Sequence, residues 1–288
     1  TSELELASPS FRSHARAALS EPLRADARAA NRLKGELGSL PAGVLPLVVE
    51  ALAATECAAA LEPLESLLGR SPELDLAVID GLARAGAARP WRVGAEVAEC
   101  LERLALSKEV ARRAAATRAL GRLARIDSVP RLVPRLQDPA PEVVAAAIEA
   151  LQCCAQRTDL ADAESWRAWL ERENEWWTAR GELCVAALQS DDPAALTENL
   201  RELYGHRLAR SATADALLGR IARMEPSELV LACSALGRLG DLEAVPELVP
   251  LLDAAEAPVR EAAWKALRTL TGVDLPAERS LWDAYAFE

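Results

Sequence analysis

Apolar residues recur every three or four positions along most of this chain, and short polar segments containing proline or aspartate interrupt them. The clearest stretch is 110–125, whose apolar side chains share one helical face and predict an amphipathic helix. A short helix through 129–136 follows, with Pro130 in its first turn, where no amide hydrogen bond is lost. The turn 137–141 ends that helix, and 142–156 predicts a third one. The pattern therefore predicts repeated helix–turn–helix units.

This pattern occurs twice in one register. The segment 119–123, Ala-Leu-Gly-Arg-Leu, recurs 116 positions later as 235–239. The same shift relates further identical residues, among them Val129 and Val245, Pro134 and Pro250, Ala146 and Ala262, Leu151 and Leu267, and Trp166 and Trp282. Trp169 falls opposite Tyr285. A register held over so many positions indicates a duplicated unit.

The repeated residues carry a family resemblance. The combination of A-L-G-R-L, V-P-x-L-V-P-x-L-x-D and P-x-V-x-x-A-A-x-x-A-L resembles HEAT repeats of the bacterial, phycobilisome-lyase-like kind. The best matches are 109–156 and 228–271, with degenerate repeats expected across 41–106 and 178–224. The resemblance implies an all-α fold, an α-solenoid of stacked HEAT-like hairpins with a right-handed superhelix. It also implies a binding scaffold, because HEAT arrays are mostly of that kind.

An amphipathic helix pair cannot bury its apolar stripe alone, so successive pairs are expected to stack. We expect three parts. Residues 1–40 form a helical cap at the N-terminal end, 41–271 form the repeat array, and 272–288 form a second cap that contains tryptophan.

The composition agrees with an all-α fold. Aromatic residues make up only 4% of the chain, and alanine and leucine dominate it, whereas strands favour aromatic and β-branched side chains. Hydrophobic residues at 51% exclude intrinsic disorder. The net charge of -11 argues against general nucleic-acid binding, which depends on clustered lysine and arginine. We therefore expect a protein partner, for which an acidic surface is one candidate, and no nucleic acid.

No segment predicts a membrane span or a signal peptide. The longest apolar stretch, 40–61, contains two prolines and two glutamates, and the N-terminus has no basic start before an apolar core. The cysteines show no metal spacing such as C-x-x-C, and each lies in an Ala- and Leu-rich helical segment: Cys57, Cys100, Cys153, Cys154, Cys184 and Cys233. A free cysteine is a good small core residue, so we expect these cysteines to be reduced thiols. Reduced thiols are typical of the cytoplasm, which predicts a cytoplasmic protein.

No catalytic constellation is present in the sequence. His14 and His206 are the only histidines, and no P-loop, G-x-S-x-G or zinc motif occurs. Phycobilin lyases share the repeat, but the resemblance is confined to repeat positions and transfers no catalytic residue. We therefore expect no enzyme activity, no cofactor and no metal, and we predict a non-catalytic protein-interaction scaffold. The alternative is an accessory subunit, or a lyase-like or enzymatic HEAT protein acting on a bound cofactor or macromolecule.

Aromatic residues supply one candidate surface. Four tryptophans lie on one predicted helix, 162–180: Trp166, Trp169, Trp176 and Trp177. At about 100° per residue they project within one arc and predict a single aromatic ridge. Trp166 has a duplicate at Trp282, which favours packing. Trp176 and Trp177 have none, so a partner-binding role is considered for them.

Charge supplies the second candidate surface. Residues 108–137 contain two acidic residues and eight basic ones, which gives a net charge of +6: Lys108, Arg112, Arg113, Arg118, Arg122, Arg125, Arg131 and Arg135. Arg118, Arg122 and Arg125 are spaced to share one helix face. The duplicate segment 228–253 has one arginine against five acidic residues, so the fold does not require the basic stripe. A solvated helix face is one reading, and contact with an acidic protein partner, extended by Arg131 and Arg135, is the hypothesis.

Overall fold

A computed structural model describes residues 13–14, 17–18, 27–54, 60–88, 90–160, 162–190 and 192–287. Every regular element in these ranges is a helix and none is a strand, which confirms the all-α prediction. Cys57 and most of the predicted cap 1–40 lie outside the described residues. The chain divides into two compact units, the first ending at Ala163 and the second beginning at Glu164. The handedness of the superhelix and the boundaries of the caps stay predictions.

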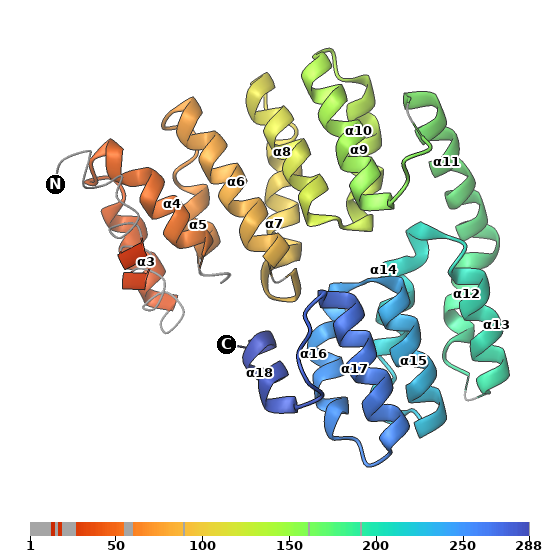
Figure 1. Ribbon diagram of the computed structural model, residues 1–288. Coiled ribbons are helices and arrows are strands. Elements are labelled where there is room, and N and C mark those ends of the chain that lie inside the picture. The colour runs from red at the N-terminus through yellow and green to blue at the C-terminus, as the bar shows by residue number, and fades with distance from the viewer. Residues whose placement is uncertain are drawn as a thin grey trace. The chain divides into compact units, whose positions relative to one another are not determined.

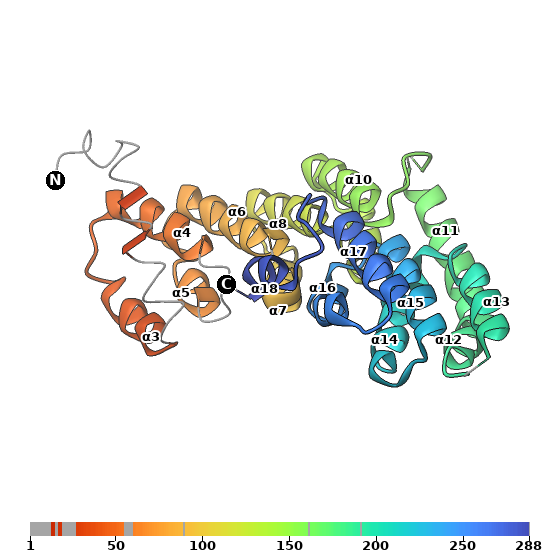
Figure 2. The ribbon, with the colours of Figure 1, turned by 60° about the horizontal axis from the view of Figure 1, so that its bottom comes forward.

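The first unit is built from helices that pack in two rows (Figures 1 and 2). The helices α4, α6, α8 and α10 lie side by side, and α5, α7 and α9 pack against them. The bounds are α3 Ala27–Glu36, α4 Leu45–Ala53, α5 Leu61–Glu65, α6 Pro72–Ala88, α7 Pro90–Leu104, α8 Val110–Leu123, α9 Val129–Leu132 and α10 Pro141–Ala155. A 3₁₀ turn, η4 (Val133–Gln137), extends α9, and Pro134 at its start breaks the α-helical hydrogen bonding.

The second unit begins with one long helical run. Helix α11 passes through a π-helical turn, η5 (Trp177–Gly181), into α12. Helices α15 and α17 then pack side by side, and α18 packs against the 3₁₀ turn η9 (Val249–Asp253). The bounds are α11 Ala163–Trp176, α12 Glu182–Ala187, α13 Pro193–Leu203, α14 Arg210–Leu218, α15 Pro226–Leu239, α16 Val245–Leu248, α17 Ala257–Thr271 and α18 Arg279–Phe287.

The duplicated sequence has a duplicated backbone. Helices α8, α9 and α10 correspond to α15, α16 and α17, and every bound in the second copy lies 116 positions after its equivalent in the first. Two helix ends also match. Ala124 (φ 51°) and Gln156 (φ 51°) are left-handed, as are their equivalents Gly240 (φ 72°) and Gly272 (φ 69°). A left-handed residue is a common way to end a helix, and glycine is the residue that adopts it without steric cost. The predicted duplication is confirmed.

The aromatic residues of the repeat are duplicated as well. The rings of Trp166 and Trp169 meet edge to face, with centroids 5.6 Å apart and planes at 85°. Trp282 and Tyr285 repeat this geometry at 5.9 Å and 83°. Trp166 and Trp282 are fully buried. The packing role expected for this tryptophan therefore holds in both copies.

No helix among the described residues is long and apolar enough to cross a bilayer.

Candidate functional site

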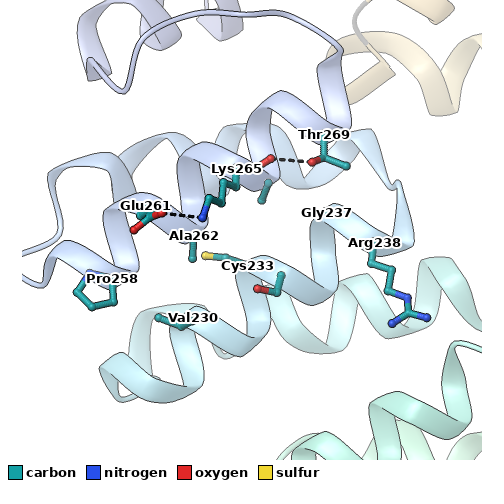
Figure 3. A pocket seen from close by; sticks show the side chains of 11 residues that line it. Val230, Cys233, Gly237, Arg238, Pro258, Glu261, Ala262, Lys265 and Thr269 are labelled. Carbon is teal, nitrogen blue, oxygen red and sulfur yellow. Dashed lines mark hydrogen bonds and ion pairs between the residues drawn. The ribbon is translucent and has the colours of Figure 1, made fainter.

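A groove of about 600 Å³ lies between α15 and α17. Figure 3 shows side chains of α15 facing side chains of α17 across it. The lining residues are Val230, Cys233, Ser234, Gly237, Arg238, Pro258, Glu261, Ala262, Lys265, Ala266 and Thr269. Helices α15 and α17 come close together at Gly237 and Ala266, where a Cβ atom added to the glycine would lie 3.1 Å from the alanine Cα atom.

The floor of this groove is apolar and its rim is polar. Cys233 and Ala266 are buried, and Ala262 is half-buried. On the rim, the Lys265 ammonium lies 2.6 Å from a carboxylate oxygen of Glu261, one turn away on the same helix. The Arg238 guanidinium lies over the ring of Tyr204, 4.4 Å from its centroid, in a cation–π contact.

The equivalent position in the first copy is bridged. Arg118 on α8 and Glu149 on α10 stand where the second copy has Ser234 and Lys265. The Nε atom of Arg118 lies 3.5 Å from a carboxylate oxygen of Glu149, so the pair joins the two helices across their seam. Ala146 beneath it is fully buried, whereas its equivalent Ala262 is half-buried. The two copies therefore present different surfaces on one backbone.

The arginines predicted to form one stripe lie on different surfaces. Arg122 and Arg118 are on α8, and Arg122 pairs with Asp80 of α6. Helix α8 ends at Leu123, so the prediction that Arg125 shares its face is wrong. The left-handed Ala124 turns the chain, and the Arg125 side chain, only 18% exposed, lies 3.6 Å from Asp127.

Arg131 and Arg135 belong to the other row of helices. Arg131 on α9 lies 2.9 Å from a carboxylate oxygen of Glu102 on α7, and Arg135 on η4 donates to the Ala105 carbonyl at 3.4 Å. Both line a groove of about 480 Å³ together with Glu99, Glu102, Arg103, Ala105, Leu106, Leu120, Leu132 and Pro134. The five arginines therefore do not form one continuous stripe.

The four tryptophans form two pairs rather than one ridge. Trp166 and Trp169 are buried, whereas Trp176 and Trp177 are half-buried and meet at 6.5 Å and 60°. Trp176 stacks on the His206 ring, with centroids 3.5 Å apart and planes at 7°. The π-helical turn that begins at Trp177 also changes the helical register assumed for a regular helix. A partner-binding role for Trp176 and Trp177 stays a prediction, and both rings also have contacts within the chain.

Charged groups surround this second pair. The Nδ1 atom of His206 lies 3.4 Å from a carboxylate oxygen of Glu173. Arg180 donates to both carboxylate oxygens of Glu202, at 3.1 and 2.7 Å, and this pair lowers the pKa of Glu202 to about 2. The Arg180–Glu202 pair therefore joins the π-helical turn η5 to helix α13.

The described thiols differ in accessibility, which gives a first testable prediction. Burial raises the pKa of Cys233 and of Cys100 to about 12, and only the thiolate is nucleophilic. Cys153 is exposed. Iodoacetamide at pH 8 is expected to alkylate Cys153 in the folded protein well before Cys100 and Cys233, as peptide mass mapping would measure. Equal labelling of Cys233 and Cys153 would mean that the floor of the α15–α17 groove opens to solvent.

Among the described residues, no group of three or more His, Cys, Asp or Glu side chains is arranged to hold a metal ion.

Comparison with known protein families found one match. The family described as the PBS lyase HEAT-like repeat matches residues 232–254, which run from α15 through η9. This match supports a HEAT-repeat protein. The bacterial origin and the subgroup stay predictions, since the matched segment is one repeat. The helical hairpins on both sides of it agree with a HEAT-like helical repeat fold.

The other comparisons add little. No curated protein matches the chain. A crystal structure described as that of an engineered protein is 22% identical, covers 74% of this chain and 96% of its own, and has a TM-score of 0.30. A structural similarity this low supports no conclusion about fold or function.

Proposed function

We propose that this chain is a non-catalytic scaffold that binds another protein through the outer faces of its repeated helices. The observation that carries the proposal is the duplicated unit. Packing positions such as Gly121 and Gly237 agree between the copies, whereas exposed positions such as Arg118 and Ser234 differ. Helix packing alone needs no such difference, and a HEAT-like repeat supports a scaffold. Buried thiols such as Cys233 fit a reducing compartment, so we propose the cytoplasm.

The exposed arginines on α8 are the binding residues we propose for an acidic partner. The side chains of Arg118 and Arg122 are 47% and 55% exposed. Their pairs with Glu149 and Asp80 are surface ion pairs, which typically contribute about 0–1 kcal/mol. A carboxylate of a partner can therefore replace the internal one at little cost, and the planar guanidinium can hold it by two hydrogen bonds.

Reversing these two charges tests the proposal. The partner is first isolated by pull-down, and the Arg118→Glu, Arg122→Glu double variant is then expected to bind it roughly tenfold or more weakly at low salt, with a smaller salt dependence. The helix content should be unchanged, although the loss of the surface ion pairs with Glu149 and Asp80 lowers stability by up to about 1 kcal/mol each. Surface plasmon resonance at several salt concentrations measures the affinity for the partner and its salt dependence.

The matched control reverses two exposed charges elsewhere. Arg201 and Arg223 lie in the second unit, and both are exposed. The Arg201→Glu, Arg223→Glu variant carries the same change in net charge and should keep full affinity. An equal loss of affinity in both variants would mean that only the net charge of the protein matters, which would contradict a binding site on α8. Stoichiometric metal, or turnover abolished by one substitution, would contradict the scaffold itself.

A further inference from the structure

We propose that Glu173 and His206 together hold one proton near neutral pH and so form a pH-sensitive latch within the second unit. The latch joins the last turn of α11, which carries Glu173, to the turn before η6 (Arg207–Ala209), which carries His206. The bound proton closes the latch and its loss weakens it. The arginines on α8 take no part. The burial of the carboxylate, the unpaired nitrogen of the imidazole and the ring stacked on that imidazole support the proposal.

The carboxylate of Glu173 is buried and has few polar neighbours. Its side chain is only 9% exposed. Among the described residues, two polar groups approach it: the Nδ1 atom of His206 at 3.4 Å, and the backbone N–H of Leu208, which donates to it at 3.5 Å. A donor at 3.5 Å makes only a weak hydrogen bond. Because a buried carboxylate without a charged partner is costly, this site favours a proton on the carboxylate or on the neighbouring imidazole.

The imidazole of His206 has a buried nitrogen that faces this carboxylate. Its Nδ1 atom is shielded from solvent, and no described group meets it in hydrogen-bonding geometry. The Glu173 oxygen at 3.4 Å would have to approach by only about 0.5 Å to make a charge-assisted hydrogen bond. One proton shared by the pair therefore satisfies both buried groups, whichever of the two atoms carries it.

The Trp176 ring holds the imidazole in place. The two rings are stacked, with centroids 3.5 Å apart and planes at 7°. Trp176 follows Glu173 by three positions on α11, so the ring and the carboxylate are neighbours on one face of that helix. A cation is attracted to the face of an indole ring, so the stacked tryptophan also favours the protonated imidazole.

The other titratable groups around this site keep one charge state between pH 6 and 8: Arg180, Cys184, Glu202, Arg207 and Arg210. Arg180 and Glu202 form an ion pair at 2.7 Å, and burial raises the pKa of the Cys184 thiol beside them. Arg207 and Arg210 each have a partner of their own. Arginine stays charged throughout this range. The proton that is gained or lost there therefore belongs to the Glu173–His206 pair.

The latch should make the second unit more stable in mildly acidic solution. An unfolded histidine titrates near about pH 6.5, so the unfolded chain loses its proton before the folded pair does. Wherever the folded state binds more protons than the unfolded state, stability falls as the pH rises. The contribution of the latch is therefore fully present below about pH 6 and is lost as the pH rises to about 8.

The chain allows a direct test, because His14 is its only other histidine. Nuclear magnetic resonance of the imidazole protons follows both residues as the pH changes, and the His14→Gln variant assigns the two signals. We expect His206 to titrate about one pH unit above His14, which corresponds to a roughly tenfold tighter proton. In Glu173→Gln this difference should disappear, because the amide carries no charge that could pair with the imidazolium.

Urea unfolding followed by circular dichroism gives a second measurement. The unfolding equilibrium constant should be roughly tenfold larger at pH 8 than at pH 6. Glu173→Gln and His206→Gln should each remove most of this difference, whereas the matched control His14→Gln should keep it. Titration of His206 at or below the midpoint of His14, or a pH dependence that survives in both Glu173→Gln and His206→Gln, would overturn the proposal.

Discussion

Replacing Arg220 with methionine is expected to destabilise the second unit by about 3–5 kcal/mol, because it leaves a buried carboxylate without its partner. The side chains of Arg220 and Glu228 are each only 4% exposed, and a nitrogen of one lies 2.9 Å from an oxygen of the other. Arg220 also donates to the carbonyl oxygens of Leu188 and Ser190, at 2.6 Å each. One side chain therefore joins the turn after α12 to the start of α15.

Urea unfolding followed by circular dichroism measures this loss. The control is Arg223→Met, three residues away and exposed, for which we expect a change within about 0.5 kcal/mol. A double variant, Arg220→Met with Glu228→Gln, should recover part of the lost stability, because it removes the unpaired buried charge. The side-chain oxygen of the glutamine can still accept the hydrogen bond from the backbone N–H of Glu225. A loss below about 1 kcal/mol for Arg220→Met would contradict the structural role argued for this pair.

Much of the fold could be predicted from the sequence, because the same pattern of apolar residues occurs in both copies and produces the same packed helices. Apolar spacing and the shift of 116 positions predicted the helices and the duplication. The Arg220–Glu228 pair could not be predicted in this way. Its two residues are separated by a 3₁₀ turn, and the carbonyl oxygens that Arg220 contacts lie about 30 residues upstream, so only the packing of α12 against α14 brings them together.

The candidate sites were harder to predict because they depend on where helices end. Spacing placed Arg125 on the face of Arg118 and Arg122, but the chain turns at Ala124. An alanine does not indicate a left-handed residue, whereas a glycine such as its equivalent Gly240 does. Comparing the two copies would therefore have predicted that helix α8 ends before Ala124. The α15–α17 groove had a similar signal in the exchange of Arg118 and Glu149 for Ser234 and Lys265.

The close approach of paired helices gives the second large expected effect. A Cβ atom added to Gly121 of α8 would lie 2.6 Å from the Cα atom of Ala150 in α10, a distance that forces the backbones apart. The same atom added to Gly237 of α15 would lie 3.1 Å from the Cα atom of Ala266, which a small shift can relieve. The two positions are equivalent in the duplication, so they form a matched pair.

Alanine at Gly121 is therefore expected to destabilise the first unit by about 2 kcal/mol. Overpacking near the upper end of its usual range costs about 3 kcal/mol, and the better helix propensity of alanine returns about 1 kcal/mol. At Gly237 the two contributions are both about 1 kcal/mol, so Gly237→Ala should leave stability nearly unchanged. Urea unfolding of each variant gives the two free energies. Equal losses at both positions would contradict the difference in helix separation between the copies. A larger loss of stability at Gly121 would mean that α8 and α10, which the Arg118–Glu149 pair joins, are also the more tightly packed pair of helices. Helices α15 and α17, which have the groove between them, would then be the more loosely packed pair.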